Sequence, residues 1–281
     1  MRTINLFDEN GLDLSPVSGH QFLPQTVKIV RNQNPFNGIT IVTDKQIVKG
    51  IAKKLKSMKK VAWLSEPKVV YSQVYKKILN QEKLFDLIMT YDADLLKRGP
   101  KYVLVPVGST WIPIPYQKLY DKTKLVSSIV SKKTMFPAHK MRHEICDRYK
   151  DIDYYGTKFE YIPTKDIGLK DYMFSVAIEN CSVLNYFTEK IVDCFLCGCV
   201  PIYYGCTNIQ KFFNPNGIIT FQNIDDLGPS NPGDPITVIV DENELCLHIK
   251  DDDATLAIFL DEDDTADLIR ELQKIKKIIA K

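Results

Sequence analysis

The chain has 281 residues, a length that corresponds to about two domains of roughly 150 residues each. With 44% hydrophobic and 10% aromatic residues it can bury a core, which excludes a disordered chain. The 37 basic and 35 acidic residues nearly cancel, and the resulting net charge of +2 argues against a dedicated nucleic-acid binder.

Two further features bear on the environment of the protein. No run of roughly 18 apolar residues could form a membrane-spanning helix, and the first residues lack the apolar centre of a signal peptide. The seven cysteines, an odd number spread unevenly, favour reduced thiols over a disulfide framework. We therefore expect a cytoplasmic protein with neither a signal peptide nor a membrane anchor.

Short apolar strands alternate with helices along the first 227 residues. The sequence predicts strands over residues 26–31, 38–42, 61–64, 85–90, 102–107, 125–130, 172–178, 200–204 and 218–221, and helices over 44–58, 71–79, 139–149 and 189–197. This alternation predicts an α/β fold with parallel sheets whose faces are covered. Two such units would meet near residues 115–124, with a cleft between them, so we expect domains at 1–118 and 119–227.

The C-terminal part of the chain differs in charge and in pattern. Residues 228–235 contain three prolines and two glycines, which predicts a linker. Residues 236–281 contain twelve acidic and six basic residues, a net charge of −6, against +8 for the rest of the chain. Their pattern predicts a three-strand β-meander (236–240, 245–249 and 256–260) followed by a helix over 264–281. Because so small a unit is marginally stable alone, we expect it to dock on the body of the chain or on a protein partner.

The segment 172–205 is the most informative, because its pattern predicts a strand, a polar loop, a helix and a second strand. Ligands of open α/β sheets bind beyond the carboxyl ends of strands, which is where Glu179 and Asn180 fall. Thr188 suits the N-cap of the helix, and Lys190 lies in the first turn.

A cation at a helix N-terminus opposes the helix dipole, at a cost of about 0.3–1 kcal/mol, and a bound anion would reverse that cost. Lys190 therefore indicates a phosphate or diphosphate site. The alternative is a solvated pair of Glu189 and Lys190 at the start of the helix.

Beyond this local pattern, the chain resembles glycosyltransferase family 10, the α1,3/4-fucosyltransferases, and is most similar to their short, anchorless bacterial and viral members. The residues that carry the donor motif are Phe174, Glu179-Asn180, Tyr186-Phe187-Thr188-Glu189-Lys190 and Pro201-Ile202-Tyr203-Tyr204-Gly205. Further matching segments are Ala62–Pro67, Phe85–Asp92, Val107–Ile112, Lys140–His143 and Asp153–Gly156, so the resemblance extends over roughly residues 36–226.

The resemblance implies a GT-B-like fold of two Rossmann-type domains that face a cleft. It also implies inverting transfer of fucose from GDP-fucose to a hydroxyl of a glycan, in glycan biosynthesis inside a bacterial cell or a virus-infected host cell. In the donor pocket, Arg142 and Lys190 would bind the diphosphate and stabilise the leaving GDP, and Glu189 would bind a ribose hydroxyl. The remaining donor-pocket residues would be Asn180, Tyr186 and Thr188.

The resemblance further implies that Glu66, at the end of its strand, is the general base on the opposite wall of the cleft. From the residues alone, the alternatives are that Glu66 is a surface acid at a strand end and that Arg142 is one more charge on an exposed helix face. No Asp-x-Asp pair is placed to bridge a diphosphate, so the sequence requires no cofactor, although it permits a divalent metal.

The resemblance stops after Leu227, where the family continues with helices and this chain has its linker. The alternative to an enzyme is therefore a catalytically inactive protein that kept the fold, binds a nucleotide or a glycan, and uses its C-terminal unit for interactions.

Overall fold

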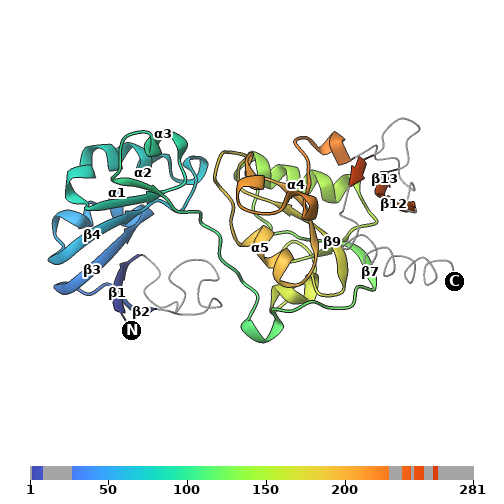
Figure 1. The fold of residues 1–281 in the computed structure, drawn as a ribbon, viewed down its shortest axis with the longest axis horizontal. Helices are drawn as coiled ribbons and strands as arrows, with labels where there is room; N and C mark the ends of the chain where they lie inside the picture. The colour runs from blue at the N-terminus through green and yellow to red at the C-terminus, as the bar shows by residue number, and fades with distance from the viewer. Residues whose placement is uncertain (1, 9–26, 228–235, 242–243, 250–255, 259–281) are drawn as a thin grey trace. The chain divides into compact units, whose positions relative to one another are not determined.

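The computed structural model describes residues 2–8, 27–227, 236–241, 244–249 and 256–258. The chain divides into two compact units, each with its own parallel sheet (Figure 1). The first unit comprises Met1–Ile114, Glu179–Val192 and Gly205–Ile209, and the second comprises Pro115–Ile178, Asp193–Tyr204 and Gln210–Lys281.

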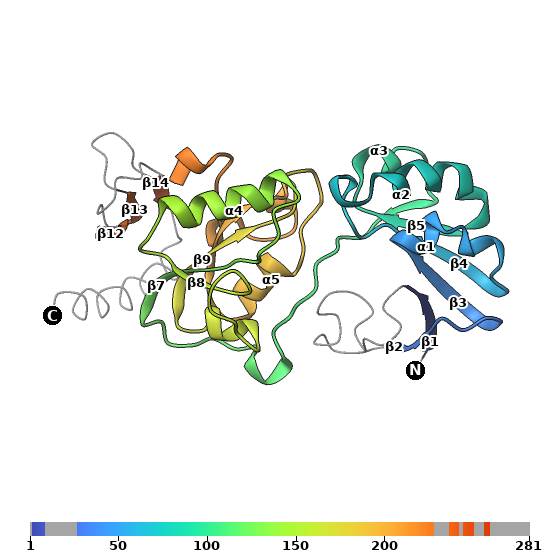
Figure 2. The same ribbon diagram turned by 180° about the vertical axis from the view of Figure 1, so that it is seen from behind.

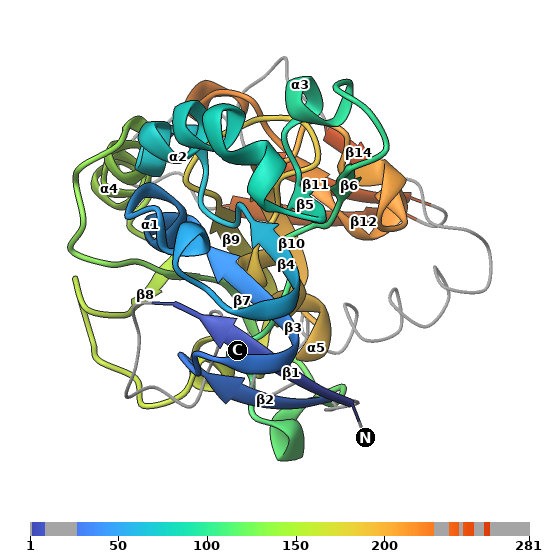
Figure 3. The same ribbon diagram turned by 90° about the vertical axis from the view of Figure 1, so that its left-hand side faces the viewer.

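The sheet of the first unit has six parallel strands in the order β2-β1-β3-β4-β5-β6 (Figure 3). These strands are β1 (Arg2–Phe7), β2 (Val27–Arg31), β3 (Phe36–Thr43), β4 (Ser57–Trp63), β5 (Leu87–Thr90) and β6 (Tyr102–Leu104). The helices α1 (Asp44–Val48), α2 (Lys68–Gln81) and α3 (Ala93–Leu96) lie on the same side of the sheet (Figures 1 and 2). Fully buried Val42, Leu64, Ile78 and Ile88 form the centre of the core between sheet and helices.

The sheet of the second unit has five parallel strands in the order β11-β10-β9-β7-β8. They are β7 (Lys124–Ile129), β8 (Asp153–Tyr155), β9 (Tyr172–Ile178), β10 (Val200–Tyr204) and β11 (Ile219–Thr220). The helices α4 (Pro137–Arg148) and α5 (Glu189–Leu196) lie on opposite faces of this sheet (Figure 2). In chain order the strands run 2-1-3-4-5, so the topological switch point, where open α/β sheets bind ligands, lies between β7 and β9.

The rest of the described backbone consists of short turns and a third sheet. The 3-10 helices are Ile51–Lys53, Glu82–Leu84, Ile114–Tyr116, Lys165–Gly168, Ile209–Lys211, Pro215–Gly217 and Ile224–Leu227. The strands β12 (Ile236–Asp241), β13 (Glu244–Ile249) and β14 (Leu256–Ile258) pair antiparallel in chain order. The predicted β-meander is therefore confirmed, whereas the predicted linker 228–235 and helix 264–281 lie outside the described residues.

The structure confirms the predicted α/β class with two parallel sheets and corrects individual elements. The predicted helix over 44–58 is wrong beyond Val48, because residues from Ser57 onward pair with β3 as strand β4. The strands β1 and β8 and the helix α3 were not predicted. Strands β9 and β10 have the predicted bounds. Cys194, Cys197 and Cys199 are buried and form no disulfide with a described residue.

Candidate functional site

The loop between β9 and α5 is fixed at both of its ends. All seven residues of β9 are buried, because this strand lies inside the sheet between β10 and β7. After α5, Gly198 adopts a φ of +66°, and the N–H of Cys199 donates to the carbonyl of Cys194 at 2.8 Å. The loop 179–188 therefore presents its polar residues from a rigid frame.

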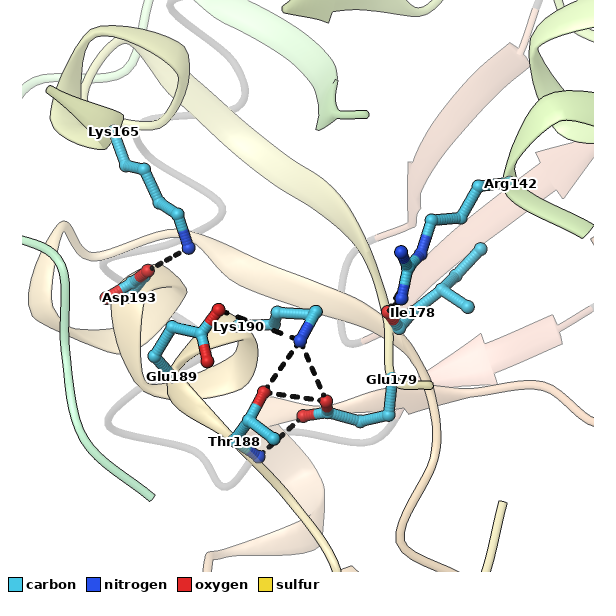
Figure 4. Close-up of polar contacts among 8 residues, drawn as sticks. All are labelled: Arg142, Lys165, Ile178, Glu179, Thr188, Glu189, Lys190 and Asp193. Carbon is cyan, nitrogen blue, oxygen red and sulfur yellow. Dashed lines mark hydrogen bonds and ion pairs between the residues drawn. The ribbon is translucent and has the colours of Figure 1, made fainter. Parts of the chain in front are cut away.

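A buried carboxylate, that of Glu179, organises this loop (Figure 4). Its side chain is 0% exposed and accepts hydrogen bonds from the N–H and the hydroxyl of Thr188, both at 2.7 Å. The Nζ of Lys190 donates to Glu179 at 3.2 Å and to Oγ1 of Thr188 at 2.8 Å. Oε1 of Glu189 lies 3.6 Å from the same ammonium group. Lys190 is thus held between two carboxylates.

This arrangement constrains what Lys190 can do. Lys190 does not form the solvated pair with Glu189 that the sequence left open as an alternative, because its shorter contact is to the buried Glu179. The two carboxylates and the ammonium sum to one negative charge. A phosphate would therefore need positive charge from a further residue to bind here.

Arg142 lies at the end of the same strand, β9. Its helix α4 begins with a proline at the first turn, where the missing N–H costs no hydrogen bond. Arg142 is 9% exposed, and its Nε and NH2 groups donate to the carbonyl of Ile178 at 3.1 and 2.6 Å (Figure 4). Arg142 is therefore a buried cation at the switch point of the second sheet, and the alternative of an exposed helix charge is wrong.

A second buried ion pair anchors α5 farther along the helix. Asp193 has a side chain that is 2% exposed, and one of its oxygens lies 2.9 Å from Nζ of Lys165. The lysine is 26% exposed, close to the 23% of Lys190. Two similar pairs of a buried acid and a half-buried lysine therefore hold α5, Lys190 with Glu179 and Lys165 with Asp193. Of these two pairs, the first lies in the predicted donor motif and the second does not.

Glu66 follows strand β4 as the sequence predicts, and it is partly exposed. Its backbone is held by Asp44, whose carboxylate accepts hydrogen bonds from the N–H of Ser65 at 3.1 Å, the N–H of Glu66 at 3.3 Å and the hydroxyl of Ser65. Burial raises the pKa of Asp44 to about 7, the hydrogen bond from Ser65 lowers it, and the negative charge of Glu66 raises it. Sequence reasoning missed Asp44, because its place after one strand gives no sign of a contact with Ser65 and Glu66, 21 and 22 residues along the chain.

Tyr186 and Asn180 differ in their surroundings. Tyr186 is 1% exposed, and its ring packs at 4.8 Å from that of Tyr91 in the core of the first unit. Burial raises its pKa well above the usual value, so the phenol stays protonated. Asn180 is partly exposed in the loop directly after Glu179.

The fold resembles that of solved sugar transferases. A crystal structure of an α1,3-fucosyltransferase with GDP-fucose superposes with a TM-score of 0.52 at 18% identity, covering 80% of this chain and 75% of that one. A crystal structure of an α1,3-fucosyltransferase with GDP also superposes with a TM-score of 0.52 at 18% identity, covering 80% of this chain and 76% of that one. The chain is therefore an α/β protein of the GT-B-like class.

Sequence matches to known proteins cover part of the chain. Residues 119–228 match the family model "Glycosyltransferase family 10 (fucosyltransferase) C-term", which confirms the predicted resemblance. The chain is 34% identical over 68 residues to the α-(1,3)-fucosyltransferase FucT of Helicobacter pylori, covering 23% of this chain and 14% of that protein. It is 43% identical over 52 residues to an α-(1,4)-fucosyltransferase of Arabidopsis thaliana, covering 18% of this chain and 13% of that protein. These matches span a small part of the relatives' own lengths.

The described residues also bear on metals and membranes. Among these residues, no three His, Cys, Asp or Glu side chains are grouped so that they could hold a metal ion. In the same part of the chain, every helix is too short or too polar to cross a membrane.

Proposed function

We propose that this chain is an inverting glycosyltransferase that transfers fucose from GDP-fucose to a hydroxyl of a glycan acceptor. One observation carries the proposal: in the segment that matches the family model, Arg142 is bonded to the last carbonyl of β9, and the next residue, Glu179, holds Lys190. The structural neighbour solved with GDP-fucose supports the choice of donor. The buried free cysteines support a reducing compartment such as the cytoplasm.

In the proposed donor site, Arg142 and Lys190 bind the diphosphate. Lys190 alone is offset by two carboxylates, so the second cation supplies the charge that an anion needs. The planar guanidinium suits two phosphate oxygens at once. Both cations stabilise the negative charge that develops as GDP leaves, so no step requires a metal ion.

The other donor-site residues have supporting roles in the proposal. Glu189 accepts hydrogen bonds from a ribose hydroxyl, and Asn180 lines the pocket. Thr188 fixes the start of α5 through its bonds to Glu179. Tyr186 keeps the loop in place through its packing on Tyr91.

Glu66 is the proposed general base. It removes the proton of the acceptor hydroxyl, the oxygen forms a bond to the anomeric carbon of fucose, and the bond from that carbon to GDP breaks with its electron pair on the phosphate. Inversion requires the base on the face opposite the leaving group. Such a base contributes typically about 10²–10⁴-fold to the rate.

A donor screen tests the proposal. Release of nucleotide from GDP-, UDP- and CMP-sugars is measured with a panel of glycan acceptors, and we expect turnover with GDP-fucose, with and without EDTA. Glu66→Gln should retain GDP affinity by calorimetry and lower kcat by about 10²–10⁴-fold. Wild-type protein that binds GDP but turns over no donor would instead support the alternative of an inactive nucleotide-binding protein.

The phosphate assignment has a matched control. Lys190→Met should weaken GDP binding by at least about tenfold, because it removes one of two cations. Lys165→Met removes a lysine of similar exposure from a similar buried pair outside the donor motif, and should leave GDP affinity unchanged. Equal effects of the two substitutions would mean that Lys190 acts only through the stability of α5.

A further inference from the structure

We propose that Asp44 is the positioning residue of the catalytic base: it holds the Ser65–Glu66 segment so that the carboxylate of Glu66 is fixed above the end of its strand. The inference rests on the proposed function for the role of Glu66. Asp44 itself touches no reacting atom in this proposal, and it acts only through the backbone of the segment that carries Glu66.

The hydrogen bonds of Asp44 carry the argument. One carboxylate oxygen accepts from both consecutive backbone N–H groups, those of Ser65 and Glu66, and the other accepts from the Ser65 hydroxyl. Neither N–H belongs to the β-ladder, because β4 ends at Trp63. Without Asp44 these N–H groups would lose their partner where the strand gives way to irregular backbone.

The sheet explains how Asp44 reaches this segment. Strands β3 and β4 run parallel, with Thr43 beside Trp63 in the register. Asp44 follows directly after Thr43, and Ser65 and Glu66 follow two and three residues after Trp63. The segments that follow β3 and β4 therefore leave the sheet side by side. Asp44 also has a φ of +20°, a value that few residues other than glycine adopt. Such a backbone conformation costs conformational energy, and it persists where the surrounding structure holds the residue in place.

A second contact fixes the other side of the same peptide segment. The carbonyl of Glu66 accepts a hydrogen bond from the Tyr75 hydroxyl at 2.7 Å, and that hydroxyl also bonds to the Tyr91 hydroxyl at 2.8 Å. Glu66 is thus clamped through its N–H by Asp44 and through its carbonyl by Tyr75. Holding the backbone on both sides restricts where the carboxylate of Glu66 can lie.

A buried carboxylate is expensive, so a purely structural acceptor would be better served by a neutral group. Asparagine at this position could preserve the hydrogen bonds, because its carbonyl oxygen can accept both N–H groups and its amide can donate to the Ser65 oxygen. Alanine could not. The pair of variants Asp44→Asn and Asp44→Ala therefore separates the hydrogen-bonded geometry from the negative charge.

Hydrogen exchange tests the holding role without any assay of activity. In Asp44→Ala, the amides of Ser65 and Glu66 should exchange at least about tenfold faster than in wild type, whereas Asp44→Asn should restore protection. Asp92→Ala is the control, since Asp92 is equally buried and caps α3 after strand β5. It should leave these two amides unchanged. Unaltered exchange in Asp44→Ala would overturn the inference, even if the wild type turned over no donor.

Kinetics test the consequence for catalysis in a wild type that turns over GDP-fucose. Asp44→Ala should lower kcat by about 10²-fold with little change in the KM for GDP-fucose, because a base displaced by about an ångström loses that much. In the Glu66→Gln background the same substitution should cost less than about threefold, since a residue that acts through Glu66 has nothing left to position. Equal losses in both backgrounds would show general destabilisation and overturn the inference. Absence of wild-type turnover would refute the proposed function alone, and the exchange result would still decide whether Asp44 holds the segment.

Discussion

Two buried carboxylates hold loops in this molecule, and they do so in opposite electrostatic surroundings. Asp44 and Glu179 are 8% and 0% exposed, and each follows directly on the last residue of a parallel strand. Each accepts a backbone N–H and a hydroxyl from the loop that it holds. Glu179 also has the ammonium of Lys190, whereas the charged group whose influence raises the pKa of Asp44 is a second acid, Glu66.

The difference teaches what each carboxylate can contribute. A cation beside a buried carboxylate offsets part of the cost of its burial, and removing one partner of such a pair is strongly destabilising. Burial raises the pKa of Asp44 to about 7, and the negative charge of Glu66 beside it adds to the rise. The first arrangement suits a loop that meets an anion. The second makes the loop that carries Glu66 sensitive to pH.

The largest effect we expect is on the pH dependence of stability at Asp44. Because its folded pKa of about 7 lies above the usual 3.8, the folded state holds the proton more tightly than the unfolded state. The contribution of Asp44 to the free energy of unfolding is therefore full below about pH 4 and falls as the pH rises to about 7, by up to about 4 kcal/mol. Urea titrations at several pH values give the free energy of unfolding of wild type and of Asp44→Asn. The difference between the two proteins at each pH measures the contribution of Asp44.

A second variant sharpens this test. The hydrogen bond from the Ser65 hydroxyl lowers the pKa of Asp44, so Ser65→Ala should move the upper end of the pH window above 7. A difference between wild type and Asp44→Asn that stays constant from pH 4 to 8 would show that Asp44 does not titrate as a buried acid, and the contrast with Glu179 would disappear.

The next largest effect concerns the pair itself. Lys190→Met leaves the buried charge of Glu179 without its cation, and should lower the free energy of unfolding by about 2–4 kcal/mol. Adding Glu179→Gln removes the orphaned charge, and the double variant should recover to within about 1 kcal/mol of wild type. GDP affinity should stay low in both proteins, because neither has the ammonium. Recovery of GDP binding along with stability would contradict a direct role of Lys190 with phosphate.

These contrasts also show how far the sequence alone could lead. Arg142, Glu66 and Lys190 were predicted as site residues because they lie in ordered motifs with recognisable neighbours. Asp44 was missed because it is one of 35 acidic residues, and its partners lie 21 and 22 residues away, across two strands. No local pattern marks such a contact, which depends on the register of β3 with β4.

Two other differences have the same origin in tertiary structure. The predicted helix over 44–58 runs into β4, whose first half is polar and largely exposed, so that neither hydrophobic period nor composition marks it as a strand. Pairing with β3 decides its conformation. Tyr186 was assigned to the donor pocket through the motif. The structure buries its ring in the core beside Tyr91, and a tyrosine in a polar loop gives no sign of which surroundings it will have.

The smallest expected effect tests whether the cationic region depends on geometry as well as charge. The Nε and NH2 groups of Arg142 share the carbonyl of Ile178, which sets the plane of the guanidinium directly before Glu179. Arg142→Lys keeps the charge but loses the two-pronged contact, and should weaken GDP binding about tenfold, or about 1.4 kcal/mol. Arg148→Lys, on the same helix with exposed partners Glu144 and Asp225, should not change it. If Arg142→Lys bound GDP as wild type does, the anion would respond to net charge alone, and the buried frame around Glu179 would have no part in orienting it.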